Sequence, residues 1–105
     1  MKNGTMDKYK NKSIMRIATS DCRVCGKKMK IAFAIINGGL YTPFDFSNEH
    51  VKFATDNGVM IKMQFSKTMG QSYLANTCEH CGNFVGDFFI HEYIDEPDSV
   101  ELEML

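Results

Sequence analysis

The 105-residue sequence has no run of about 18 apolar residues, the length that a helix needs to cross a bilayer, and so predicts no membrane-spanning segment. Residues 1–13 are polar and basic and lack the apolar stretch of a secretory signal. Low-complexity tracts are absent, and the only internal repeat is one short duplicated motif. These absences lead us to expect a single domain that works in the reducing cytoplasm.

Basic residues are missing from the C-terminal end, because residues 87–105 contain no Lys or Arg and carry a net charge of −7. Residues 1–30 carry +7, residues 31–86 carry −1, and the whole chain carries −1. This separation indicates either solvated ends that attract each other or charged contacts for a partner. We expect a flexible basic arm over 1–12, a folded domain over 13–95 and an acidic tail over 96–105.

Cysteine is scarce, and all four cysteines lie in two copies of the motif Cys-x-x-Cys-Gly, at 22–26 and 78–82. Two intervening residues let a tight turn point both sulfurs at one ion, and the glycine accepts a positive φ in that turn. Four thiolates complete a tetrahedral zinc shell and leave no position for a reactive water. The sequence therefore predicts a structural Zn²⁺ site with the ligands Cys22, Cys25, Cys78 and Cys81.

The cysteine motifs admit two other interpretations. The motifs could be independent redox dithiols, but such a dithiol usually opens a helix that lowers the pKa of its first thiol. The residues after each motif look like strands, which argues against this interpretation. Iron in place of zinc suits the same four sulfurs and stays open.

The hydrophobic pattern predicts an α+β fold: a small antiparallel β-sheet, a four-cysteine zinc ribbon and one or two short helices. Strands are expected at 14–18, 31–36, 59–65 and 73–75. A helix over 48–55 would be capped by Ser47 or Asp45 and followed by Gly58 as a left-handed cap, and residues 40–46 would form a loop or an edge segment.

Three further expectations concern which side chains of a segment are buried and whether the segment is a strand or a helix. Val59, Ile61, Met63 and Phe65 alternate, which predicts one buried strand face. Residues 84–90 are expected to be a strand, with a helix over 87–94 as the competing interpretation. Ser99 could cap a final helical turn with Val100 and Leu102 pointing inward.

Outside the cysteines, two groups of residues suggest other functions. Asp87, His91 and Glu92 could perform acid–base chemistry or bind a second metal, although polar residues after a core strand are often only surface residues. The basic arm could meet phosphates together with a group of basic residues around the first motif: Arg23, Lys27, Lys28 and Lys30.

Residues 65–82, which read FSKTMGQSYLANTCEHCG, resemble small uncharacterised bacterial and phage zinc-ribbon proteins. Those proteins also begin with Cys-x-x-Cys-Gly-Lys, here Cys22–Lys27, and continue with Gly-Asp-Phe-Phe-x-His, here Gly86–His91. The resemblance covers residues 20–93 and departs at Glu79, where proline is frequent, and at Arg23, where an aromatic residue is common. It implies zinc at the four cysteines and carries no established activity.

We therefore expect a zinc-binding, non-enzymatic interaction module, with another protein as partner, such as an adaptor or regulator of a host or bacterial protein complex. The first alternative is a nucleic-acid-binding zinc ribbon, whose affinity would fall steeply with rising salt. The second is a small metal-dependent hydrolase or nuclease that uses Asp87, His91 and Glu92.

Overall fold

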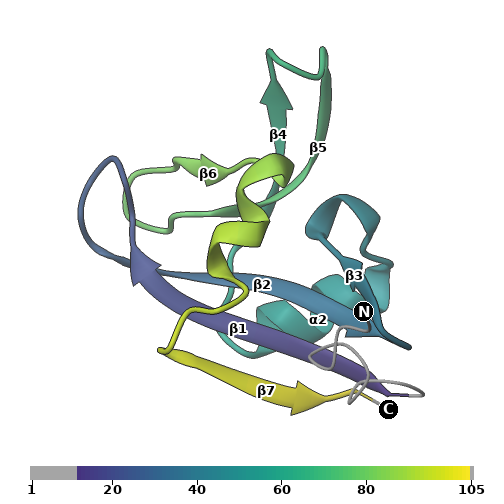
Figure 1. Ribbon diagram of the computed structural model, residues 1–105. Helices are drawn as coiled ribbons and strands as arrows, with labels where there is room; N and C mark the ends of the chain where they lie inside the picture. The colour runs from purple at the N-terminus through teal and green to yellow at the C-terminus, as the bar shows by residue number, and fades with distance from the viewer. Residues whose placement is uncertain (1–11, 105) are drawn as a thin grey trace, which may run out of the picture.

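A computed structural model describes residues 12–104, which form two antiparallel sheets with short helices beside them (Figure 1). The first sheet has the order β3-β2-β1-β7 and the second has the order β4-β5-β6. The strands are β1 (Ser13–Asp21), β2 (Lys28–Ile36), β3 (Gly39–Tyr41), β4 (Ile61–Ser66), β5 (Gln71–Thr77), β6 (Phe84–Val85) and β7 (Ser99–Glu103). The helices are the α-helix α2 (Asn48–Asp56) and the 3-10 helices η1 (Pro43–Asp45) and η2 (Asp87–Tyr93). The predicted α+β class is confirmed.

The β1–β2 hairpin is the centre of the fold, with register running from Ser13 opposite Ile36 to Asp21 opposite Lys28. Apolar clusters cover both faces of this hairpin. Phe33 belongs to the cluster that contains Ile90 of η2, whereas Ala34 belongs to the cluster that contains Ala54 of α2. Burial on both faces explains why the middle of β2 is continuously apolar instead of alternating.

Helix α2 begins where the sequence predicted, and Ser47 is the cap. The hydroxyl oxygen of Ser47 accepts a hydrogen bond from the His50 amide at 3.2 Å, and the Ser47 amide donates to His50 Nδ1 at 3.1 Å. This reciprocal capping box uses two backbone donors that a helix N-terminus leaves without partners. Gly58 follows the helix with φ 89°, as expected of a left-handed cap.

The segment after the second cysteine motif differs from the expected strand. Only Phe84–Val85 pairs with β5, and residues 87–93 form the 3-10 helix η2. A 3-10 helix has about three residues per turn, so Ile90 and Tyr93 lie on one side, and both are buried in the core. The competing helical interpretation over 87–94 was therefore nearer to the observed structure.

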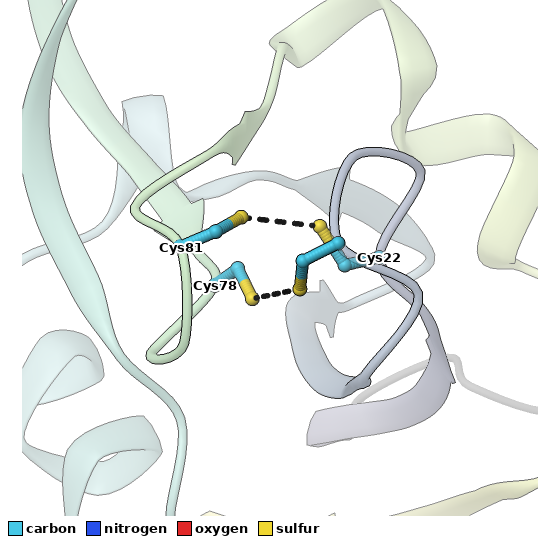
Figure 2. A group of neighbouring side chains, drawn as sticks. Cys22, Cys78 and Cys81 are labelled. Carbon is cyan, nitrogen blue, oxygen red and sulfur yellow. Dashed lines mark hydrogen bonds between the residues drawn. The ribbon is translucent and has the colours of Figure 1, made fainter.

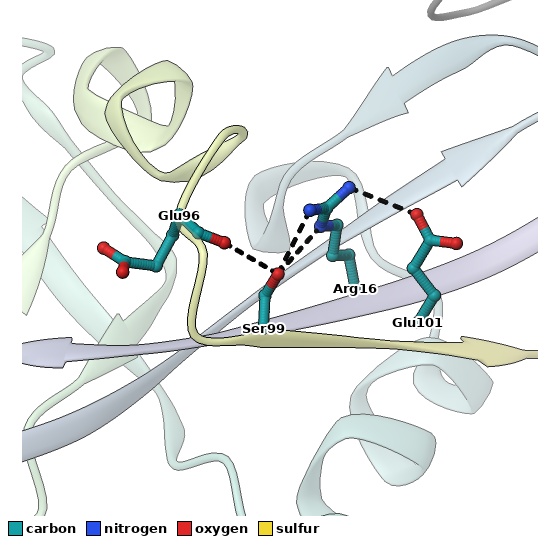
Figure 3. A network of polar contacts seen from close by, with 4 residues as sticks. All are labelled: Arg16, Glu96, Ser99 and Glu101. Carbon is teal, nitrogen blue, oxygen red and sulfur yellow. Dashed lines mark hydrogen bonds and ion pairs between the residues drawn. The ribbon is translucent and has the colours of Figure 1, made fainter.

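The expected helical turn at Ser99 is wrong, because Ser99–Glu103 form strand β7, which pairs antiparallel with β1. Arg16 of β1 joins this edge: its Nε and Nη2 donate to Ser99 Oγ at 3.3 and 3.1 Å, and its Nη1 lies 3.1 Å from Glu101 Oε2 (Figure 3). Ser99 Oγ in turn donates to the carbonyl oxygen of Glu96 at 2.8 Å. Val100 is exposed, not inward.

The division of the chain into arm, domain and tail remains a prediction, since residues 1–11 of the basic arm lie outside the described residues.

Replacing Arg16 with methionine is expected to loosen β7 while leaving the rest of the first sheet intact. The variant loses hydrogen bonds to Ser99 and Glu101, a cost of about 1–2 kcal/mol in the free energy of unfolding. Hydrogen exchange should then become faster at the amides of β7 and stay unchanged in the middle of β2. The control is Lys52→Met, which removes an exposed pair with Asp56 and should cost less than about 0.5 kcal/mol. Unchanged protection of β7 in the Arg16 variant would contradict this prediction.

The expected buried face of β4 is wrong at its outer end. Val59 is buried and Ile61 is partly buried, but Met63 is 62% exposed and Phe65 is 59% exposed. The β4–β5 hairpin extends away from the first sheet (Figure 1), and the side of its outer half that carries Met63 and Phe65 is left uncovered, although Tyr73 and Ser66 in the same half are buried. None of the helices in residues 12–104 is long and apolar enough to cross a bilayer.

Candidate metal centre

The first cysteine motif forms the tight connection between β1 and β2. The Cys22 amide donates to the carbonyl oxygen of Lys27 at 2.8 Å, and the Gly26 amide donates to the carbonyl oxygen of Cys22 at 2.9 Å. The Val24 amide lies 3.4 Å from Cys22 Sγ. Gly26 has φ 77°, a conformation that a residue with a Cβ seldom adopts. The turn therefore directs backbone amides towards the sulfurs.

The second motif repeats this turn between β5 and β6. The Cys78 amide donates to the carbonyl oxygen of Asn83 at 2.7 Å, and the Gly82 amide donates to the carbonyl oxygen of Cys78 at 2.9 Å. Gly82 has φ 81°. Two stretches of similar sequence thus adopt the same local structure at the ends of hairpins that belong to different sheets.

The four sulfurs converge, as the sequence predicted: their Sγ atoms all lie within 4.8 Å of one another (Figure 2). Cys22 Sγ is 3.6 Å from Cys81 Sγ, and Cys25 Sγ is 3.7 Å from Cys78 Sγ. These separations are far longer than a disulfide bond, and all four cysteines are free. A tetrahedral ion with metal–sulfur bonds of about 2.3 Å requires sulfurs about 3.8 Å apart. The cluster therefore has the dimensions of a site for one metal ion.

The electrostatics of the thiols also suit a cation. The backbone amides of Cys25 and Val24 stabilise the thiolate of Cys22 and lower its pKa to about 6. The amide of Asn83 favours the thiolate of Cys81, but partial desolvation of the thiol and the neighbouring sulfurs outweigh it and raise the pKa of Cys81 to about 12. Four adjacent sulfurs thus ionise together only when a positive ion compensates their charge, and metal binding must release protons.

Burial differs between the two cysteines of each motif. Cys22 and Cys78 are buried and belong to the core cluster that contains Ile90, whereas Cys25 and Cys81 are exposed. The centre is consequently half in the core and half at the surface. An ion held there would join the end of the β1–β2 hairpin to the end of the β5–β6 hairpin.

A second connection between the sheets was missed by the sequence reasoning. The side chain of Asn76 in β5 is fully buried. Its Oδ1 accepts from the Ala32 amide at 2.8 Å, and its Nδ2 donates to the Ala32 carbonyl oxygen at 3.0 Å. The carboxamide therefore pairs with β2 as another strand would. The one available signal was a polar residue that directly follows the apolar residues Leu74 and Ala75, two positions before Cys78.

The other predicted site residues do not gather into a metal group. The carboxylate of Glu92 forms an ion pair with Arg23, and the backbone amide of Asp87 donates to the Tyr73 hydroxyl at 3.1 Å. Among the residues that the structure describes, the four cysteines lie close enough together to hold a metal ion, and His91 belongs to no such group of potential ligands.

Two of the basic residues proposed for phosphate contacts are engaged within the chain. Arg23 pairs with Glu92, and Lys28 Nζ lies 3.0 Å from Asp21 Oδ1. The hydrogen bond and charge of Asp21 raise the pKa of Lys28. These pairs reduce the positive charge that the first motif presents to a partner.

No family model, curated protein or solved structure matches the chain. The resemblance to small bacterial and phage zinc-ribbon proteins therefore remains a prediction.

Proposed function

We propose that this chain is a zinc-binding interaction module without catalytic activity, which acts as an adaptor or regulator within a protein complex. The observation that carries the proposal is the closed group of four sulfurs at the base of an exposed hairpin. A four-thiolate shell has no open position for substrate or water, so the metal would stabilise structure.

Zinc is favoured over iron by the chemistry of the site. Four thiolates in tetrahedral arrangement suit an ion without geometric preference of its own, and Zn²⁺ binds more tightly than Fe²⁺ to the same ligands. The freshly purified protein is expected to contain one equivalent of zinc. Elemental analysis tests this, and iron as the main metal, or no metal, would contradict it.

The β4–β5 hairpin supports an interaction role. Met63 faces Leu74 across the strands and Phe65 faces Ser72, so these side chains share one side of the hairpin. Because Met63 and Phe65 are both largely exposed, this side presents apolar surface beyond the core. Exposed apolar patches on small proteins often mark interaction sites.

The Phe65→Ser variant tests the interaction role in cells of the source organism. Proteins captured by the tagged wild type should be recovered about tenfold less by this variant, as expected when a central aromatic contact is lost. Val100→Ser, which removes another exposed apolar side chain on β7, is the control and should capture as the wild type does. Both variants should keep the metal content and melting temperature. Undiminished capture by Phe65→Ser would contradict the role of the hairpin.

A further inference from the structure

A groove of about 450 Å³ lies beside the β4–β5 hairpin, and the metal centre positions two of its walls. Arg23 of the first cysteine motif and Asn83, the residue after the second motif, both line the groove. The carbonyl oxygen of Asn83 accepts a hydrogen bond from the Cys78 amide, which fixes Asn83 beside the second motif. The remaining lining comes from Met29 of β2, from the β4–β5 hairpin, and from β6, Gly86 and η2. Three regions far apart in the chain, 23–29, 65–73 and 83–93, thus enclose one concave surface.

Five of the residues that line this groove are aromatic. Tyr73 and Tyr93 are buried and line it, whereas Phe65 and Phe89 line it while remaining 59% and 47% exposed. Exposed phenylalanine rings at a concave surface lose water contact when an apolar group enters between them, which favours binding. The volume lies within the range of ligand pockets, about 300–1,000 Å³.

The charged side chains that line the groove are all cationic. Arg23 and Lys67 are the ionisable cationic side chains of the lining, and no Asp or Glu is part of it. The Arg23 guanidinium lies over the Phe89 ring, 5.6 Å from its centroid, and pairs with Glu92 outside the lining. These contacts hold Arg23 in position before a ligand arrives, which reduces the entropy lost on binding.

We infer that this groove binds a peptide segment of a partner protein, in which large apolar side chains are flanked by Asp or Glu. The apolar side chains would lie between Phe65 and Phe89, and the carboxylates would pair with Arg23 and Lys67. The inference rests on the proposed interaction function and names the chemistry of its partner. Single-stranded nucleic acid fits less well, because it needs several phosphate contacts. The lining supplies two cations, and one already pairs with Glu92.

The test is selection from a yeast-displayed library of random peptides of about 12 residues against the full-length, zinc-loaded chain. Enriched peptides should carry aromatic or aliphatic residues with Asp or Glu beside them. Fluorescence anisotropy with synthetic copies should show binding about tenfold weaker or more for Phe65→Ser, Phe89→Ser and Lys67→Glu. The matched controls Val100→Ser and Lys52→Glu lie outside the groove lining and should bind as the wild type does. Zinc content and melting temperature verify that each variant is folded.

Several results would overturn the inference. One is enrichment of peptides without acidic residues, and another is binding that survives Phe89→Ser. Binding of a labelled oligothymidine that Phe89→Ser abolishes would assign the groove to nucleic acid instead. A dimer in size-exclusion chromatography that Phe65→Ser dissociates would assign it to a second copy of the chain. If capture of a cellular protein depends on Phe65 but no acidic peptide competes with it, the peptide chemistry is wrong while the interaction function stands.

Discussion

The Cys78→Ser variant is expected to lose its metal and most of its free energy of unfolding. Structural zinc contributes about 10–16 kcal/mol of apparent binding free energy, which counts as folding free energy when the unfolded chain has no site. The whole stability of a domain is about 5–15 kcal/mol. Cys78 is buried in the core, so the substitution also places a hydroxyl group among apolar side chains.

Elemental analysis and thermal unfolding followed by circular dichroism measure this effect. The wild type treated with a chelator should resemble the variant, because both lack the bound ion. The control is His80→Ser in the same motif, since the imidazole is not part of the four-sulfur group. Full metal content and an unchanged melting temperature in Cys78→Ser would refute a structural role for the cluster.

Substitutions of Asn76, to Asp or to Leu, should be the most destabilising of those outside the cysteines. Asn76 Nδ2 donates to the Ala32 carbonyl oxygen, and a carboxylate would place a second acceptor there, in a fully buried position. An uncompensated buried charge costs about 3–5 kcal/mol. Asn76→Leu keeps a similar volume and leaves the Ala32 amide and carbonyl without partners, each at a cost of about 1–3 kcal/mol.

Urea unfolding of the zinc-loaded protein at pH 7 compares these variants. Gln71→Glu makes the same amide-to-acid change at an exposed position of β5 and should alter the stability by less than about 0.5 kcal/mol. If Asn76→Asp unfolds at the same urea concentration as this control, the carboxamide does not connect the sheets in solution. Metal content measured in parallel separates loss of this connection from loss of the ion.

Both predictions concern the junction between the two sheets, where the cysteine cluster and Asn76 lie. The core cluster that contains Cys22 and Cys78 also contains Phe33 of β2 and Val85 of β6, so the two sheets share a core next to the metal centre. Apolar contacts do not specify one orientation of the sheets, whereas a tetrahedral ion and a doubly hydrogen-bonded carboxamide do. The shape of the groove beside Arg23 therefore depends on this junction.

The local elements were largely predictable because their signals are local. Ser47 was one of two candidate caps for α2, and the capping box with His50 lies within four residues of chain. Gly58 follows the helix with the positive φ that its position required. The turns of the two cysteine motifs were likewise set by residues within each motif, since short-range hydrogen bonds close them.

The amino-acid sequence by itself determined the strands on both sides of the first cysteine motif and before the second, the helix with Ser47 as one of two candidate caps, and the four sulfurs that come together. Only the tertiary structure decided which side of β4 remains exposed, that residues 99–103 form an edge strand, and that Asn76 joins the sheets. The physical reason is that these features depend on which surface covers a segment. Arg16 and Ser99 are 83 residues apart, and Asn76 and Ala32 are 44 apart, so no periodicity within a short window contains their contacts.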